Sequence, residues 1–581
     1  MDSKQELLER AGAWRDGDPD KETAAELQRL IDSGDERELR ERLDATLEFG
    51  TAGLRGVIGA GPNRMNRAVV RRTTAGLARY LIENVPDVRQ RGVVIGRDGR
   101  RMSLEFARDT AGVFCAHGIP AHVFPDVVPT PVTAFAALRL NAAAAVMVTA
   151  SHNPPEYNGY KVYWGNGAQI IPPHDSGIAK AIAEAGPARD VPVMDREDAR
   201  ATGLWRTVGP EMGAAYLEAI LAERRNPRPA PDLRIVYTAM HGVGGSWVED
   251  AFLQAGFVAL SKVHAQQQPD GNFPTVRFPN PEEPGAMDLA LALAEEEGAD
   301  LILANDPDAD RLAVGARDAQ GKMRMLTGNE VGVLLGHYLL TQTPPERLLG
   351  KRPLVVTTIV SSPQLGGIAR DLGAAYAETL TGFKWIANVG LQREGAGEEQ
   401  FVFGYEEALG YTVGTVARDK DGVGAALVFA DLAAWCQARG SSVLGYLEEI
   451  ARRHGLYVAG QANFTFKGAE GAKTIGRIMD GFRASPPASI GGLRVTETLD
   501  YRKGARGLPP SNVIAYELEG GSRITLRPSG TEPKIKYYLD VKETTAEGEP
   551  MTAARVRAAQ KLSALTEAFV ALARERGQPA A

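Results

Sequence analysis

The sequence predicts an α/β fold: three similar α/β domains in series, each on a mixed and mainly parallel sheet, then an α+β domain, with the four domains around a central cleft. Short apolar runs typical of strands alternate with segments of helical period. A strand, a turn of small residues and a helix recur from Leu233 and again from Pro353. From about Ala451 the strands alternate polar and apolar residues, as in an antiparallel sheet. The predicted domains are residues 1–205, 206–325, 326–450 and 451–581.

Length and composition set the broad class. The 581 residues exceed what one core supports, and 44% hydrophobic with 24% charged residues is typical of a globular protein. A net charge of -7 repels duplex nucleic acid and anionic membranes on average, so we expect neither as a partner. With no apolar membrane span and no secretory leader in the sequence, the expected compartment is cytoplasmic. Cys115 and Cys436 are predicted to be reduced core residues, and the chain a monomer or homodimer.

The chain begins with a predicted helical extension. Residues 3–44 have a helical period with one apolar stripe, which favours a docked helical segment. The segment from Phe49 to Gly56 then contains three glycines, which leave the backbone free to approach a ligand. Within it, Arg55 offers a fixed fork of donors for phosphate, although a purely structural glycine turn is the alternative.

The first domain has a βαβ order, which puts functional loops at the carboxyl ends of its strands. The predicted elements are helices at Val69–Val85 and Leu104–His117, strands at Gly92–Ile95, Ala121–Phe124 and Ala142–Val148, a turn at Pro129–Pro131, and a hairpin at Val162–Ile171. The charged, proline-interrupted stretch from Pro187 to Thr207 is predicted to link this domain to the second.

The loop from Thr149 to Lys161 follows a buried strand and brings Ser151, His152 and Asn153 together. Two prolines directly after Asn153 prevent a helix from starting, so the serine is expected on a rigid polar loop. A turn without chemistry is the other interpretation of the same residues.

Three aspartates, Asp306, Asp308 and Asp310, follow the predicted buried strand Leu301–Ala304. At this spacing they can converge on one face of a turn and bind a hard dication, with magnesium favoured because it readily takes a phosphate oxygen as a further ligand. An EF-hand is excluded because Arg311 stands where glycine is required. A solvated acidic turn and a phosphatase with an aspartyl nucleophile are the remaining alternatives.

The last domain is predicted to carry a phosphate-binding loop. Strands at Ser522–Leu526 and Lys534–Leu539 flank it, and the helix Ala553–Ala573 is expected to dock on the sheet. An arginine fork, hydroxyls, turn amides and a lysine suit phosphate. The loop residues expected to bind phosphate are Arg527, Ser529, Gly530, Thr531 and Lys534.

Four loops taken in order resemble the α-D-phosphohexomutase family. They are the Ser151 loop, the Asp306–Arg311 loop, Gly404–Gly410 and the loop from Arg527 to Lys534. In the family these correspond to the phosphoserine, magnesium, sugar-discriminating and phosphate-binding loops. The resemblance runs from about Phe49 to about Val541. One such loop would be weak evidence, but four loops in the same order make the resemblance specific.

The resemblance implies an intramolecular phosphotransferase of the phosphoglucomutase type. Phospho-Ser151 would give its phosphoryl group to a sugar phosphate, and the bisphosphorylated sugar would turn around and return its other phosphate. It further implies one Mg²⁺ per chain, which Ser151 and the three aspartates hold, and glucose 1,6-bisphosphate as activator. Arg311 would stabilise the transferred charge. Lys161, its proton affinity depressed by its neighbours, would move the proton, with His152 as the alternative.

The sugar loop departs from the family's usual pattern. Glu406 is expected to bind sugar hydroxyls, but Ala408 replaces a common serine, and a loop containing Thr381, Gly382 and Lys384 is expected to contact the phosphosugar. The Tyr-Glu-Glu-Ala form resembles the phosphoglucomutase-2 branch. That branch includes glucose and pentose mutases, so the loop does not decide the sugar. Glucose 1-phosphate is the expected substrate, while a phosphopentomutase, a phosphomannomutase, a glucose 1,6-bisphosphate synthase, a hydrolase and a phosphosugar sensor stay open.

Overall fold

The computed structural model describes residues 3–48, 53–228, 230–318, 320–466, 468–529 and 534–578. The chain forms two compact units, residues 1–326 with 410–434 (unit 1) and residues 327–409 with 435–581 (unit 2). Each unit contains a mixed or parallel sheet flanked by helices, and unit 2 also contains an antiparallel sheet. The predicted fold class is confirmed, whereas the bounds of the four predicted domains stay a prediction.

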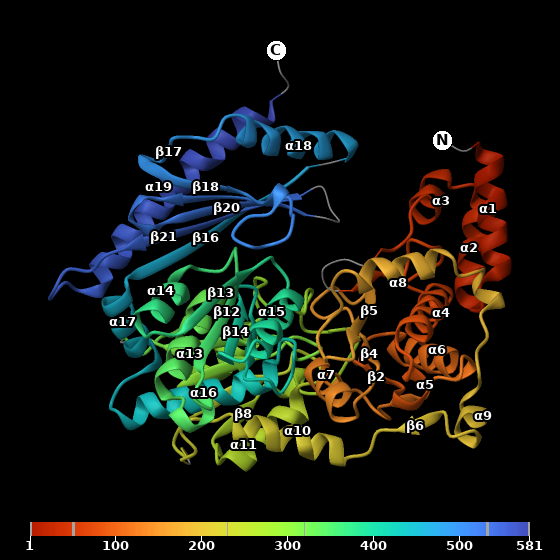
Figure 1. Cartoon of the computed structure of the whole chain (residues 1–581), viewed down its shortest axis with the longest axis horizontal. Coiled ribbons are helices and arrows are strands. Elements are labelled where there is room, and N and C mark those ends of the chain that lie inside the picture. Colours follow the sequence, from red (N-terminus) through yellow and green to blue (C-terminus); the bar gives the residue numbers. More distant parts are fainter. Residues whose placement is uncertain are drawn as a thin grey trace. The chain divides into compact units, whose positions relative to one another are not determined.

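Three helices form the predicted N-terminal extension of unit 1: α1 (Lys4–Gly17), α2 (Lys21–Ser33) and α3 (Glu36–Leu43). A capping box starts α1, because the Ser3 side chain accepts from the Glu6 amide while the Glu6 side chain accepts from the Ser3 amide. Leucines from all three helices pack in one small core, as the apolar stripe predicted. Figure 1 shows these helices together in red.

The first sheet of unit 1 has the order β1 (Leu54–Val57), β5 (Tyr157–Trp164), β4 (Ala144–Val148), β2 (Val93–Arg97), β3 (Ala121–Val123), β6 (Trp205–Thr207). The last four are mutually parallel, and β5 pairs antiparallel with β4 and β1. The accompanying helices are α4 (Arg67–Asn84), α5 (Val88–Arg91), α6 (Ser103–Ala116), α7 (Thr130–Arg139), α8 (His174–Ala183) and α9 (Arg196–Ala201). Most of this domain's predicted elements are thereby confirmed.

The predicted hairpin at Val162–Ile171 is confirmed, because Tyr163 bridges antiparallel to Gln169 and the Ile170 amide donates to the Val162 carbonyl. Two other local predictions differ from the structure. The expected turn at Pro129–Pro131 is the start of α7, because proline is tolerated in the first helical turn, where an amide has no partner. The predicted link includes β6, which pairs with β3 and so belongs to the first sheet.

The second sheet of unit 1 has the order β11 (Met323–Met325), β10 (Ala313–Arg317), β9 (Leu301–Ala304), β7 (Ile235–Thr238), β8 (Leu260–Lys262). β9, β7 and β8 are parallel, and the aspartate loop leaves the carboxyl end of β9. The other elements are α10 (Glu211–Ala222), α11 (Gly245–Ala255), α12 (Asp288–Glu296), β15 (Gly410–Val413) and the first part of α16 (Gly422–Ala438). The strand, turn and helix predicted from Leu233 are β7 and α11.

Unit 2 begins with a parallel arrangement in which β12 (Arg352–Thr358) lies between β13 (Ala375–Thr379) and β14 (Glu399–Glu406). Its helices are α13 (Gly328–Gln342), α14 (Gln364–Asp371), α15 (Phe383–Gly395) and α17 (Val443–His454). The predicted sugar loop therefore starts inside β14 rather than after it. The repeat predicted from Pro353 corresponds to β12 and α14.

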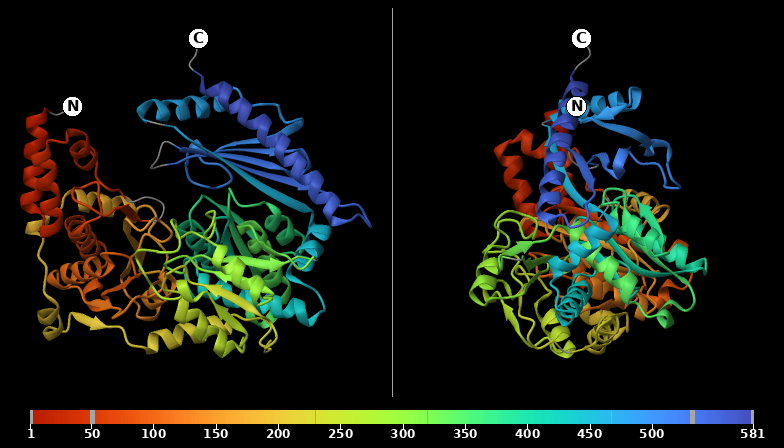
Figure 2. Two further views of the ribbon diagram at one scale, coloured as in Figure 1. Left: turned by 180° about the vertical axis from the view of Figure 1, so that it is seen from behind. Right: turned by 90° about the vertical axis from the view of Figure 1, so that its left-hand side faces the viewer.

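The C-terminal sheet of unit 2 is antiparallel, with the order β16 (Leu456–Thr465), β21 (Lys534–Glu543), β20 (Arg523–Pro528), β19 (Ile514–Leu518), β18 (Leu493–Asp500), β17 (Ser489–Ile490). Helices α18 (Gly468–Ala484) and α19 (Met551–Gly577) share one core with it. Phe569 of α19 packs edge-on to Tyr537 of β21, so the predicted docking of this helix on the sheet is confirmed. Figure 2 shows α19 running along the sheet.

Two further expectations concern buried and apolar segments. Cys115 in α6 and Cys436 in α16 are buried free thiols. Among the described helices, none combines the length and the apolar character that crossing a bilayer requires.

Candidate active site

Ser151 lies directly after β4 in a buried loop. Its φ of 49° is in the left-handed region, where a residue with a side chain is strained unless its surroundings hold it. The Ser151 amide donates to Thr149 Oγ1 at 2.8 Å, and the Ser151 hydroxyl donates to Asp306 Oδ2 at 2.6 Å. His152 Nδ1 is 3.2 Å from the same hydroxyl. The serine loop and the aspartate loop therefore meet at this hydroxyl.

Arg100 holds the serine loop in place, a role that was not predicted from the sequence. Its guanidinium is buried beside Asp98, at 3.4 Å, and lies over the ring of Phe273. It donates to the carbonyl oxygens of four loop residues, Ser151, Asn153, Pro154 and Tyr157. The polar exit of β2, Asp98-Gly99-Arg100, was the available signal, because charged residues after a parallel strand often serve a site.

We expect Arg100→Met to impair both stability and turnover. Asp98 would be left buried without its counter-charge, which costs about 3–5 kcal/mol of unfolding free energy. A loop displaced by even about 1 Å can lower kcat on the order of 10²-fold. Urea unfolding and steady-state kinetics measure the two effects. Arg101→Met is the matched control, since exposed Arg101 contacts Asn272, and equal losses in both variants would contradict the clamp.

The three aspartates converge at the carboxyl end of β9. Each offers a carboxylate oxygen within 4.8 Å of the others, and all three side chains are buried. Burial, with the charges of Asp308 and Asp310, raises the pKa of Asp306 well above its usual range. For Asp308 and Asp310, burial alone would favour a higher pKa, but the charge of Lys161 outweighs burial. The pKa of each of these two carboxyl groups is therefore lower than its ordinary value.

This carboxylate cluster fits a hard dication. Asp308 Oδ1 and Asp310 Oδ1 are buried and have no hydrogen-bond partner among the described residues. Oxygen donors of this kind are the ligands of Mg²⁺, and a cation would offset the repulsion that raises the pKa of Asp306. The residues present therefore match the predicted metal loop in chemistry.

Lys161 occupies the other side of the cluster. Its Nζ lies 2.7 Å from Asp308 Oδ2 and 2.7 Å from Asp310 Oδ2. Burial lowers the pKa of Lys161, but the two carboxylates outweigh it, so the pKa is raised. The expectation that its neighbours depress its proton affinity is thus wrong in this structure, because those neighbours are anions. Burial, with Arg311 and Arg55 nearby, lowers the pKa of His152, which favours a neutral imidazole.

Two arginines complete the part of the site in unit 1. Arg55 of β1 donates to Asn153 Oδ1 at 3.0 Å, so it reaches the serine loop. The Arg311 amide donates to Asp306 Oδ1 at 3.0 Å, and its guanidinium is 3.7 Å from Glu282. All the predicted residues of the serine and aspartate loops are thus brought together with Arg55 in one buried cluster.

Two further residues support the aspartates and were missed. Thr130, at the start of α7, donates from its hydroxyl to Asp308 Oδ2 at 2.7 Å and from its amide to the Asp308 carbonyl. Lys420 Nζ is 3.3 Å from Asp310 Oδ2, and neighbouring Asp419 accepts from the Tyr163 hydroxyl at 2.7 Å. The run Arg418-Asp419-Lys420-Asp421 was visible in the sequence, but only the tertiary fold shows what it contacts.

The predicted sugar-binding residues lie in unit 2. Glu406 ends β14 and is 8% exposed, while the side chain of neighbouring Glu407 accepts from the Ser361 hydroxyl at 3.0 Å. Ala408 follows in the turn before Gly410. Gly382 has a φ of 115°, a conformation that suits glycine. Thr381, on its amino side, has a buried hydroxyl without a partner among the described residues, and Lys384 Nζ is 5.8 Å from the ring centre of Trp385.

The predicted phosphate loop belongs to the same unit. Arg527 lies near the end of β20, opposite Lys536, and the Ser529 amide donates to the Lys534 carbonyl at 2.7 Å. Gly530 and Thr531 lie outside the described residues. Arg527 hydrogen-bonds Tyr538. Burial raises the pKa of Tyr538, and the nearby charges of Glu407 and Glu406 raise it further. Residues of the sugar and phosphate loops of unit 2 therefore lie around the same tyrosine.

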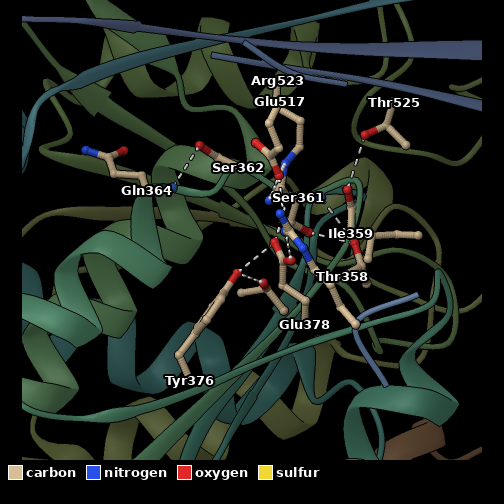
Figure 3. A network of polar contacts seen from close by, with 12 residues as sticks. Thr358, Ile359, Ser361, Ser362, Gln364, Tyr376, Glu378, Glu517, Arg523 and Thr525 are labelled. Carbon is tan, nitrogen blue, oxygen red and sulfur yellow. Dashed lines mark hydrogen bonds and ion pairs between the residues drawn. The ribbon is translucent and has the colours of Figure 1, made fainter. Parts of the chain in front are cut away.

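A buried network joins these loops within unit 2 (Figure 3). Arg523 donates to Glu378 at 2.6 Å and to Glu517 at 2.8 Å, and the hydroxyl of Thr525 donates to the carbonyl of Ile359. Glu378 is on β13, whereas Arg523 is on β20. The network therefore fixes the C-terminal sheet against the strands that carry the sugar loops.

Asp540, which pairs across from Arg523 in this sheet, should make stability depend on pH. Burial raises its pKa to about 7, although Arg523 and Ser362 oppose the shift. Between the ordinary pKa of an aspartate and pH 7, Asp540 keeps its proton in the folded state and loses it in the unfolded chain. The free energy of unfolding therefore decreases as the pH rises towards 7. Between pH 5 and pH 8 the free energy of unfolding should decrease less in Asp540→Asn than in the unmodified protein, by on the order of 2 kcal/mol. Urea titrations measure it. Exposed Asp480→Asn is the control, and an unchanged slope in Asp540→Asn would refute the assignment.

Three models of known protein domains match this chain. Models described as Phosphoglucomutase/phosphomannomutase, alpha/beta/alpha domains I, II and III match residues 46–189, 214–321 and 327–453. The crystal structure of pp63/parafusin (phosphoglucomutase) from Paramecium shares the fold, with a TM-score of 0.69, 18% identity, and 92% of this chain and 95% of that chain covered. The structural likeness shows the fold, and the three domain models place the chain in the phosphoglucomutase/phosphomannomutase class.

Curated relatives make the family plain. A Haemophilus influenzae protein named "Probable phosphomannomutase" is 43% identical over 82% of this chain and 93% of its own length. The phosphopentomutase of Homo sapiens is 36% identical over 94% of this chain and 93% of its own. The chain belongs to the α-D-phosphohexomutase family, whose members are phosphomutases, as its four loops predicted.

Proposed function

We propose that the protein is a phosphosugar mutase that interconverts glucose 1-phosphate and glucose 6-phosphate through phospho-Ser151. The observation that carries the proposal is the contact of 2.6 Å between the Ser151 hydroxyl and Asp306 Oδ2 inside the buried carboxylate cluster. Because the buried carboxylates repel one another, the cluster favours a bound dication. A hydroxyl next to that dication can carry a phosphoryl group and donate it.

In this proposal the metal ligands are Asp306, Asp308 and Asp310, with an oxygen of phospho-Ser151. Bound Mg²⁺ would supply charge neutralisation for the transferred phosphoryl group. Lys161 orients the second and third aspartates, since it bonds one oxygen of each and leaves the other oxygen free of hydrogen bonds. Arg55 and Arg311 add positive charge around the serine, which favours a phosphate there over the free hydroxyl.

The proposed chemical step is balanced within the enzyme and the sugar. A bond between phosphorus and a sugar hydroxyl oxygen forms, and the hydroxyl proton passes to a base. The bond between Ser151 Oγ and phosphorus breaks, and Oγ leaves with the electron pair and takes up a proton, which regenerates the serine hydroxyl. The second half-reaction reverses these changes at the other end of the bisphosphate. Lys161 and His152 are both retained as candidates for the base. Lys161→Met and His152→Asn separate them, because loss of the base removes the corresponding limb of the pH profile of kcat.

The unit 2 loops are proposed to bind the sugar and its non-reacting phosphate. Glu406 would accept from sugar hydroxyls, with Thr381, Gly382, Lys384 and Ala408 lining the sugar site. The proposed phosphate ligands are Arg527, Ser529, Gly530, Thr531 and Lys534. The proximity of Arg527 and Glu406 to Tyr538 supports a common substrate for the two loops.

A second substrate class has specific support. The human relative named phosphopentomutase matches nearly the full chain, and Ala408 removes a hydroxyl from the expected sugar loop. We therefore test glucose, ribose and mannose 1-phosphates with Mg²⁺ and glucose 1,6-bisphosphate as primer. The highest kcat/KM is expected with glucose 1-phosphate. A higher value with ribose 1-phosphate would favour a pentose mutase, accumulating bisphosphate a synthase, free phosphate a hydrolase, and binding without turnover a sensor.

A further inference from the structure

We propose that a cavity beside the N-terminal helices is a binding site for a small organic phosphate, separate from the serine and aspartate loops. The cavity has a volume of about 500 Å³ and lies wholly within unit 1. Residues of α1, α3, α4 and the segment 185–189 line it, among them Arg10, Trp14, Leu43, Arg72 and Arg189. Sites for small molecules have volumes of this order, about 300–1,000 Å³.

The charges around this cavity favour an anion. Among the described residues that line it are three arginines and no acidic residue, although the chain as a whole has a net charge of -7. Arg10 is 3.2 Å from Asp44 and Arg189 is 3.7 Å from Asp190, so both have carboxylates nearby. The third arginine, Arg72, is the one that differs.

Arg72 has no carboxylate partner in the part of the chain that the structure describes. Arg67 and Arg71, in the same turns of α4, pair with Asp109 at 2.7 and 2.9 Å. The Arg72 guanidinium instead donates to the carbonyl oxygen of Ala185 at 3.3 Å, and burial lowers its pKa. A half-buried guanidinium without a counter-charge is unfavourable, and an incoming anion removes that penalty.

Trp14 gives the cavity its second recognition element. The Arg72 guanidinium carbon lies 5.9 Å from the centre of the Trp14 ring. Trp14 Nε1 and Arg72 Nε are both enclosed and lack a hydrogen-bond partner among the described residues, and other atoms of both residues line the cavity. Leu43 and Pro62 add an apolar wall.

Together these features fit a compact ligand with one phosphate and an apolar or ring-shaped body. The planar fork of Arg72 matches phosphate oxygens, and the ring of Trp14 offers a surface for the body of the molecule. The loop that contains Pro62 follows β1, which carries Arg55, and α4 continues from Arg72 to Thr74, whose hydroxyl is 3.0 Å from that of Tyr160. The cavity thus adjoins elements of the candidate active site without including its residues.

The first test locates the ligand directly. Crystals of the full chain are soaked with 4-bromophenyl phosphate, and anomalous scattering locates the bromine. The proposal expects bromine in the cavity and the phosphate within hydrogen-bond distance of Arg72. Bromine confined to the serine loop, or absent from both places, overturns it. Because the serine loop is read out in the same map, failure here is distinguishable from failure of the proposed mutase function.

The second test measures binding in solution by isothermal titration with phenyl phosphate. Arg72→Met should weaken the binding at this site by about tenfold or more, since it removes charged hydrogen bonds. Ala13→Trp, on the exposed face of α1 that lines the cavity, should block it while leaving Arg72 in place. Arg79→Met, elsewhere on α4 and paired with Glu83, is the matched control and should bind as the unmodified protein does. Unchanged isotherms for both cavity variants would refute the site.

Discussion

Replacing Ser151 with alanine is expected to abolish mutase turnover, lowering kcat on the order of 10⁴-fold or more. The proposed cycle stores its phosphoryl group on this oxygen, and the variant has no atom in its place. Ser151 Oγ is within 2.6 Å of Asp306 Oδ2, whereas other hydroxyls near the aspartates, such as that of Thr130, are committed to orienting a carboxylate. No neighbouring group is therefore placed to substitute.

The measurements are a coupled assay for glucose 6-phosphate and intact-mass analysis of the purified chain. We expect the mass of one phosphoryl group on the unmodified protein after incubation with glucose 1,6-bisphosphate, and none on Ser151→Ala. Ser176→Ala, an exposed serine at the start of α8, is the control and should retain both activity and the added mass. Normal turnover by Ser151→Ala would remove the proposed carrier.

The sequence was sufficient to predict the loops because their chemistry is local. Ser151 and the three aspartates each follow a short apolar strand, and parallel strands bring their carboxyl ends to one edge of a sheet. The alternation of carboxylates at Asp306, Asp308 and Asp310 likewise predicts convergence without knowledge of any distant contact. The repeated strand, turn and helix gave the fold class for the same reason.

What the sequence could not predict depends on contacts between distant segments. Arg100 is the first of two consecutive arginines after Gly99, and nothing local shows that it, rather than Arg101, turns inward to hold Ser151. Lys161 was expected to have a lowered proton affinity, but that expectation left out the carboxylates, 147 and 149 residues away, that raise its pKa. Proline at the start of α7 was read as a turn because the same residue favours both.

Asp306→Asn should have opposite effects on stability and on function, and this combination is the sharpest test of the metal loop. Burial and the charges of Asp308 and Asp310 raise the pKa of Asp306, so its ionised form destabilises the metal-free protein at neutral pH. A neutral amide removes that repulsion, and the metal-free variant should unfold at a higher temperature. Because the substitution also removes a metal ligand, kcat should decrease on the order of 10²-fold or more.

Mg²⁺ separates these two effects. In the unmodified protein a saturating cation stabilises the folded state by about 2.7 kcal/mol at 100 times its Kd, and Tm increases with Mg²⁺ concentration. Asp306→Asn should start from a higher Tm and show little further increase. Exposed Asp232→Asn in the same unit is the matched control, expected to follow the unmodified protein in Tm, Mg²⁺ response and activity. If Asp306→Asn kept the full Mg²⁺-dependent increase in Tm, the dication would bind elsewhere. If the metal-free Tm of Asp306→Asn were lower than that of the unmodified protein, the Asp306 carboxylate would be stabilising and the repulsion argument would be wrong.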